Sequence, residues 1–94
     1  MAHVPSLDLL KATHSFPCVY VVKAIGIVEQ NFQARVVAAV RDELELTQDP
    51  TFQVRTTPDG KHVAVTLELK VATAESIIKL YHRVLAVPGL VMVF

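Results

Sequence analysis

Hydrophobic and polar residues alternate most regularly between His62 and Val71. Valine and leucine occupy every second position of this stretch, and the positions between them are mostly polar. Successive side chains of a β-strand point to opposite faces, so the pattern predicts a strand with one buried face. The stretch from Phe16 to Gly26 is different because it is apolar on both of its alternating faces. It therefore predicts a central strand of a sheet.

Two other stretches have the spacing of helices that bury one face. Between Val28 and Leu44 an apolar residue recurs every four positions: Val28, Phe32, Val36, Val40 and Leu44. This spacing predicts a first amphipathic helix from Val28 to Leu44. Thr73 is a favourable N-cap for a second helix. The buried stripe expected for that helix consists of Ile77, Tyr81 (or Leu80), Val84 and Leu85.

The remaining segments complete the order of elements. Residues 52–56 alternate and predict a half-buried strand, and Thr57-Pro58-Asp59-Gly60 predicts the hairpin turn that follows it. Residues 90–94 are all apolar and predict a last strand. We expect Gly26 to supply the backbone freedom for the turn between the first strand and the first helix.

The order strand, helix, strand, strand, helix, strand predicts an α+β, ferredoxin-like βαββαβ fold. Right-handed crossovers place both helices on one face of a four-stranded antiparallel sheet with strand order 4-1-3-2. We assign residues 16–94 to this single domain. Residues 1–15 form an amino-terminal arm, in which Ser6 could cap a short helical turn.

The two-sided apolar character of the first strand predicts an exposed surface. The open face of the first and last strands carries Val19, Val21, Ile25, Val91 and Val93 if the alternate residues face the helices, which are Tyr20, Val22, Ala24, Leu90, Met92 and Phe94. Monomers seldom expose such a patch, which favours a protein partner or a homodimer. The alternative is that the arm covers it with Leu7, Leu9 and Leu10. The opposite orientation of the strand would instead place Tyr20 on the open face.

Composition and charge exclude several classes of partner. The 94 residues contain nine basic and nine acidic side chains, so a basic footprint for nucleic acid or an anionic membrane is lacking. The predicted third strand also offers no aromatic ring to stack on RNA. No stretch is long and apolar enough to span a membrane. The single cysteine, Cys18, fits a reducing compartment, so we expect a cytoplasmic protein.

Residues with the chemistry of an active site are scattered along the chain. The four histidines have none of the spacings of metal sites. Ser15 and Cys18 lie near His14, but this segment is better explained as a solvated loop than as a nucleophile with its base. We therefore expect no metal, no cofactor and no catalysis. The best candidate for binding a small anion is the turn after the first strand, where free backbone N–H groups could meet a carboxylate. Its candidate residues are Lys23, Gly26, Glu29 and Asn31.

The chain resembles the YbeD-like family of small bacterial domains of unknown function. The likeness lies in Phe16-Pro17, in Lys23 and Gly26, in the valine-rich helix around Val36, in the strand from Val63 to Leu69, and in the closing Val-Met-Val-Phe. The resemblance implies a ferredoxin-like domain similar to ACT-type regulatory modules, with a hint of lipoate metabolism. His62 and Ala64 depart from the family, in which an aromatic and a small hydroxyl residue are frequent there.

These observations together predict a small cytoplasmic regulatory module. It would sense a small metabolite at the Gly26 turn or bind a protein partner on the open face of the sheet. An alternative is an adaptor that binds a protein partner without a small-molecule ligand. A third class, an enzyme assembled at a subunit interface, would require turnover that nothing in the sequence indicates.

Overall fold

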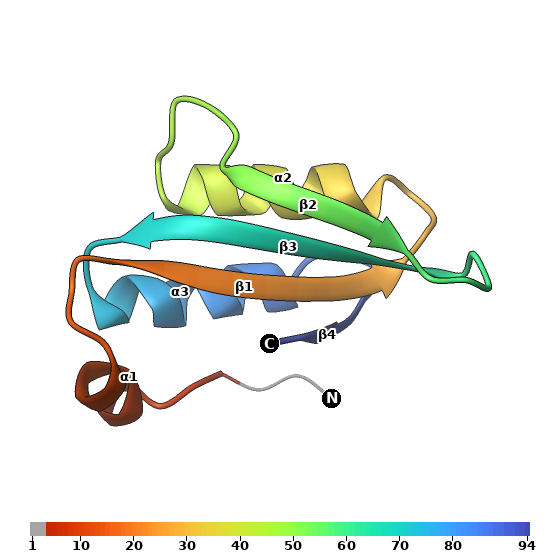
Figure 1. The fold of residues 1–94 in the computed structure, drawn as a ribbon. Coiled ribbons are helices and arrows are strands. Elements are labelled where there is room, and N and C mark those ends of the chain that lie inside the picture. Colours follow the sequence, from red (N-terminus) through yellow and green to blue (C-terminus); the bar gives the residue numbers. More distant parts are fainter. Residues whose placement is uncertain (1–3) are drawn as a thin grey trace.

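The computed structural model describes residues 4–94, which form an antiparallel sheet with its long helices on one face (Figure 1). The strands are β1 (Cys18–Ile27), β2 (Thr51–Thr56), β3 (His62–Val71) and β4 (Leu90–Val93), and the helices are α1 (Leu7–Thr13), α2 (Phe32–Glu43) and α3 (Ala74–Leu85). The strand order β2-β3-β1-β4 is the predicted order 4-1-3-2 read backwards. The α+β class and the sheet order are therefore confirmed.

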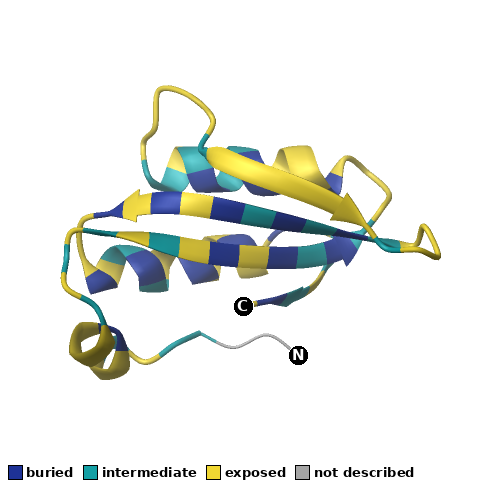
Figure 2. Cartoon of the chain, viewed as in Figure 1, coloured by how far each residue is buried: buried dark blue, intermediate teal, exposed yellow. Residues whose placement is uncertain are grey.

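The two long central strands, β1 and β3, pair along their whole length, from Cys18 opposite Val71 to Ile27 opposite His62. Val22 and Ala24 are buried against the helices, whereas Val19 and Val21 are exposed. Figure 2 shows this alternation along both strands. The predicted orientation of β1 is confirmed. The core contains Val22, Ala24, Phe32, Val36, Val40, Val65, Leu67, Leu69, Ile77, Leu80 and Val84.

The junction between β1 and α2 differs from the prediction. The strand continues to Ile27, and α2 begins only at Phe32. The Ile27 N–H donates to the Gly89 carbonyl at 3.0 Å and the Val28 N–H donates to the Lys61 carbonyl at 3.1 Å. These bonds keep the chain extended, so Val28 is exposed instead of belonging to the helix stripe. The predicted start of this helix at Val28 was wrong.

Gly26 does not make the turn that we predicted, because it lies within β1 opposite Val63 and Leu90. Its role is to make room for Phe32. A Cβ atom at position 26 would lie 2.5 Å from the Cε1 and Cζ atoms of the buried Phe32 ring. The turn instead uses Gln30 and Asn31, whose φ angles are 62° and 55°. Asparagine tolerates this left-handed conformation better than most residues.

A β-bulge in β4 corrects the predicted faces of that strand. Met92 pairs with Ile25 and Leu90 pairs with Gly26, so Val91 is an extra residue between these two pairs. Val93 pairs with the buried Ala24 and is itself 3% exposed. The placement of Val93 on the open face was therefore wrong. The extra residue reverses the alternation, because two residues of β4 oppose a single step of β1.

The β2–β3 hairpin has the predicted turn but a less buried first strand. Gly60 has a φ angle of 72°, and its N–H donates to the Thr57 carbonyl at 2.9 Å. All six residues of β2 are exposed, as Figure 2 shows, and Phe52 and Val54 are only partly covered although they lie on the helix side. This strand forms one edge of the sheet, and α2 packs over β3 and β1 instead. The prediction of a half-buried strand was wrong.

The amino-terminal arm contains the helical turn that we predicted. Ser6 caps α1, accepting a hydrogen bond from the Leu9 N–H at 3.0 Å. The helix packs on α3 through the buried Leu10, and Lys11 lies 3.4 Å from Glu75. The pKa of the Glu75 carboxyl is lowered, first by its own backbone N–H and then by Lys11. The described part of the arm thus joins the helix layer and leaves the open face of the sheet uncovered.

The hydroxyl groups of Tyr20 in β1 and Tyr81 in α3 lie 3.3 Å apart on the helix face of the sheet. Burial raises the pKa of the Tyr81 hydroxyl. A phenol with a raised pKa in the folded state stabilises the fold below its unfolded pKa of about 10, and this stability is lost as the pH rises further. We expect the free energy of unfolding to fall steeply above about pH 10 in the wild type and less steeply in Tyr81→Phe. Urea denaturation between pH 8 and 11 measures both slopes, and equal slopes would contradict this assignment.

Candidate functional site

The open face of the sheet carries a group of apolar side chains over β1 and β4, which we call the apolar strip. It consists of Val19, Val21, Ile25, Met92 and Phe94. Val19, Val21 and Phe94 are 60%, 54% and 57% exposed. Met92 shares this face because it pairs with Ile25, and Phe94 shares it because it exchanges two backbone hydrogen bonds with Lys23. Each of these three side chains is thus more than half exposed in the described part of the chain.

The surface around the apolar strip is positively charged, although the whole chain is neutral. Register places Lys70 opposite Val19, Glu68 opposite Val21 and Arg55 opposite Ala64 on this same face. With Lys23, the face carries three basic side chains and one carboxylate. An apolar strip beside an excess of positive charge favours an apolar partner that also carries acidic groups.

The edge of β1 that faces β4 is paired at Lys23 but has no backbone partner at Val19 and Val21 among the described residues. The Lys23 N–H donates to the Phe94 carbonyl at 3.2 Å, and the Phe94 N–H donates back at 2.9 Å. Backbone groups of every second residue in an antiparallel strand point the same way, so those of Val19 and Val21 point to the same side as those of Lys23. Within residues 4–94 they meet no hydrogen-bonding partner. Tyr20 and Val22 point to β3 instead.

This difference predicts a period of two in amide exchange along β1. We expect the amides of Val19 and Val21 to exchange with solvent at least about tenfold faster than those of Tyr20 and Val22, which donate to β3. Hydrogen–deuterium exchange followed by NMR resolves each amide. Equal protection at all four residues would mean that the edge is already occupied in solution.

The structure does not bring the predicted ligand-binding residues together. Lys23 points to the open face, whereas Gly26 lies on the helix face, where the Phe32 ring fills the space beside it. Glu29 and Asn31 are exposed residues of the turn between β1 and α2. These four residues therefore do not surround a common site. The predicted site does not form because β1 extends beyond Gly26, which separates that glycine from the turn.

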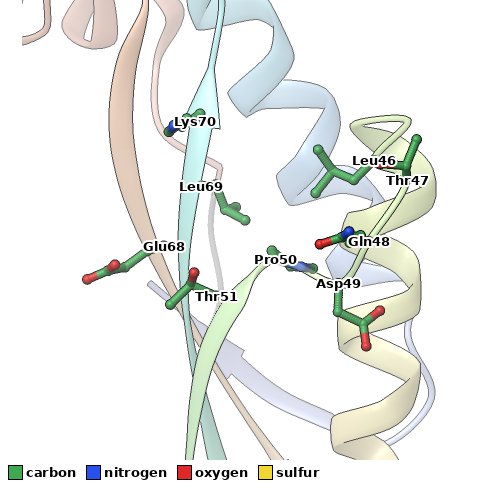
Figure 3. A pocket seen from close by; sticks show the side chains of 9 residues that line it. All are labelled: Leu46, Thr47, Gln48, Asp49, Pro50, Thr51, Glu68, Leu69 and Lys70. Atoms are coloured by element: carbon green, nitrogen blue, oxygen red, sulfur yellow. The ribbon is translucent and has the colours of Figure 1, made fainter.

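A hollow of about 290 Å³ lies elsewhere, between the α2–β2 loop and the end of β3. Figure 3 shows Leu46, Leu69 and the Gln48 amide directed toward it, while Glu68 and Lys70 point away. The carboxylate of another lining residue, Asp49, is bound by Arg41 at 2.8 Å. Among the side chains in this view, the hollow is thus mainly apolar and receives no free charge.

In residues 4–94, histidine, cysteine, aspartate and glutamate nowhere gather in threes with a geometry that could hold a metal ion. None of the three helices has the length and apolar character needed to cross a membrane. The apolar strip and the adjoining edge of β1 are the most distinctive surface features.

Sequence reasoning missed Met92 and Phe94 as members of the apolar strip and assigned Val93 in their place. A signal was available, because an isolated glycine inside a strand pattern often marks a bulge. The bulge lies opposite the step from Ile25 to Gly26. Val91, the bulge residue, is 47% exposed, so its predicted exposure holds while that of Val93 does not.

A search of curated proteins found no match. The model of one family, described as "Protein of unknown function (DUF493)", matches residues 11–94, which include every strand and both long helices. This agrees with the resemblance carried by the strand and helix residues above. The chain therefore belongs to DUF493, the YbeD-like family of unknown function.

Proposed function

We propose that this domain is a non-catalytic binding module that docks a protein partner on the open face of its sheet. The observation that carries the proposal is the apolar strip, in which Val19, Val21 and Phe94 are each more than half exposed on one face. Large exposed apolar patches that are rimmed by polar residues mark interaction sites. The rim here consists of Lys23, Lys70 and Glu68.

The position of the helices also supports this role. The helices α2 and α3 cover the opposite face of the sheet, and α1 packs on α3. The open face is thus a surface built on the two longest strands. Sites built on regular strands hold their side chains more precisely than sites on loops.

A role in sensing small metabolites has weaker support. The residues expected to hold such a ligand lie on two faces of the sheet, and the hollow in Figure 3 presents no free charge that would orient a charged metabolite. A partner that changes the association state of the domain would still give it a regulatory role. We therefore favour the adaptor over the metabolite sensor.

Site-specific photo-crosslinking in the native cells tests the proposal. The photoreactive amino acid p-benzoyl-phenylalanine replaces Val21 in one variant and Val28 in the control, because both valines are about half exposed but only Val21 lies on the open face. We expect a specific crosslinked protein from position 21 only. The purified crosslinked protein is then tested for binding to the wild-type domain.

Binding by substituted domains decides whether the captured protein is a true partner. We expect Val21→Glu to weaken binding at least about tenfold, because it replaces an apolar side chain of the strip with a carboxylate that repels the acidic groups of the partner, and Val28→Glu to have little effect. Equal affinities of the two variants, or crosslinks only from position 28, would contradict docking on this face.

A further inference from the structure

The free edge of β1 specifies the form of the partner more closely than its apolar strip does. Val19 and Val21 together offer two N–H and two C=O groups that point away from β3, on the same edge of β1 that pairs with β4 further along the strand. A row of unpaired N–H and C=O groups of this kind is matched best by the backbone of another extended strand. The stretch is short, because β4 pairs with β1 only from Lys23 onward.

We propose that an extended segment of the partner adds to this edge as a further strand, in line with β4. This inference rests on the proposed function and names how the partner binds. The incoming strand would form up to four backbone hydrogen bonds with Val19 and Val21. Its alternate side chains would lie on the open face beside these two valines, where apolar residues fit the apolar strip.

Charge further defines the incoming segment. The open face carries Lys23, Arg55 and Lys70 against the single carboxylate of Glu68. Acidic residues in the segment would be attracted to this surface, whereas a second copy of the chain would bring the same positive excess against it. A segment that combines alternating apolar residues with acidic ones therefore matches both properties of the site.

The surroundings of the edge also favour a single strand over a folded domain. Figure 1 shows α1 and the described residues that precede it on the side of β1 to which the free groups point. A folded second copy that paired through its own β1 would have to accommodate both arms. One added strand requires a spacing of only about 4.8 Å from β1.

The test uses random dodecapeptides displayed on phage and selected against the immobilised domain. We expect the selected sequences to alternate apolar residues and to be rich in aspartate and glutamate. Synthetic copies of the best sequence are then N-methylated at one position at a time. Because a strand turns every second N–H toward its neighbour, affinity should fall at least about tenfold at alternate positions and change little between them.

Two variants of the domain provide a matched check. Val21→Pro and Val21→Ala both remove the branched valine side chain, but only proline removes the outward N–H, and proline is tolerated at such edge positions. We expect Val21→Pro to bind the peptide at least about tenfold more weakly than Val21→Ala. The N-methylation series remains decisive if Val21→Pro fails to fold, because it uses the wild-type domain.

The outcomes separate this inference from the proposed function. A flat N-methylation series with binding still lost in Val21→Glu would overturn strand addition and leave docking on the open face intact. Peptides whose affinity is unchanged in Val21→Glu, or a library that yields no binder, would overturn strand addition at this edge. A wild-type dimer in sedimentation that Val21→Pro dissociates would identify a second copy as the occupant and overturn the partner strand.

Discussion

Gly26→Ala should destabilise the domain by about 1–3 kcal/mol or more, although alanine suits a strand better than glycine. The added Cβ would lie 2.5 Å from two atoms of the Phe32 ring and 2.6 Å from a third. The ring cannot swing away, because Phe32 is 1% exposed and packed in the core. Urea denaturation of the wild type and the variant measures the loss.

A double variant identifies the cause. Phe32→Ala alone should cost about 3–5 kcal/mol, since it leaves a cavity in the core. In Gly26→Ala/Phe32→Ala the new methyl group occupies part of that cavity, so the double variant should be more stable than the sum of the two losses by about 0.5–3 kcal/mol. Strictly additive losses would mean that Gly26 is required for a reason other than its contact with Phe32.

Val93→Asn should be far more destabilising than Val91→Asn. Val93 is 3% exposed and pairs with the buried Ala24, so a polar side chain there loses its hydrogen bonds to water, at a cost of at least about 2 kcal/mol. Val91 is 47% exposed at the bulge, and the same substitution there should cost about 1 kcal/mol or less. Thermal and urea unfolding of the two variants give the comparison.

The two variants share one substitution in one strand, two residues apart, so each is the control for the other. In an unbulged β4 both residues would lie on one face, and they would respond alike. Similar losses of stability, or a larger loss for Val91→Asn, would therefore contradict the bulge between Leu90 and Met92. The assignment of Met92 and Phe94 to the apolar strip would then have to be withdrawn.

The sequence predicted the fold wherever a regular period extended over a whole element. The alternation in β3 and the two-sided apolar character of β1 follow from the pleat of a strand, and they gave the sheet order and the exposed Val19 and Val21. The cap at Ser6 was also predictable, because its side chain acts locally on the Leu9 N–H.

The details that sequence reasoning missed depend on contacts between distant segments. Val28 continues the helical spacing of α2, but its N–H is held by the Lys61 carbonyl of the β2–β3 hairpin. Gly26 looked like a turn residue, and only its contact with Phe32 reveals its packing role. The sequence predicted the apolar strip and its β1 residues, but it assigned the wrong residues of β4. One extra residue in β4 reverses the alternation of every side chain that follows.

The most direct test of docking on the open face is a cross-saturation NMR experiment on the domain bound to its crosslinked partner. The domain carries labelled methyl groups in a deuterated background, and the protons of the partner are saturated. The account predicts loss of signal at the methyl groups of Val19, Val21, Ile25 and Met92 and unchanged signals at Val28 and at Leu9, which is 58% exposed on α1. Signal loss confined to α1 and α3, with the apolar strip unaffected, would contradict it.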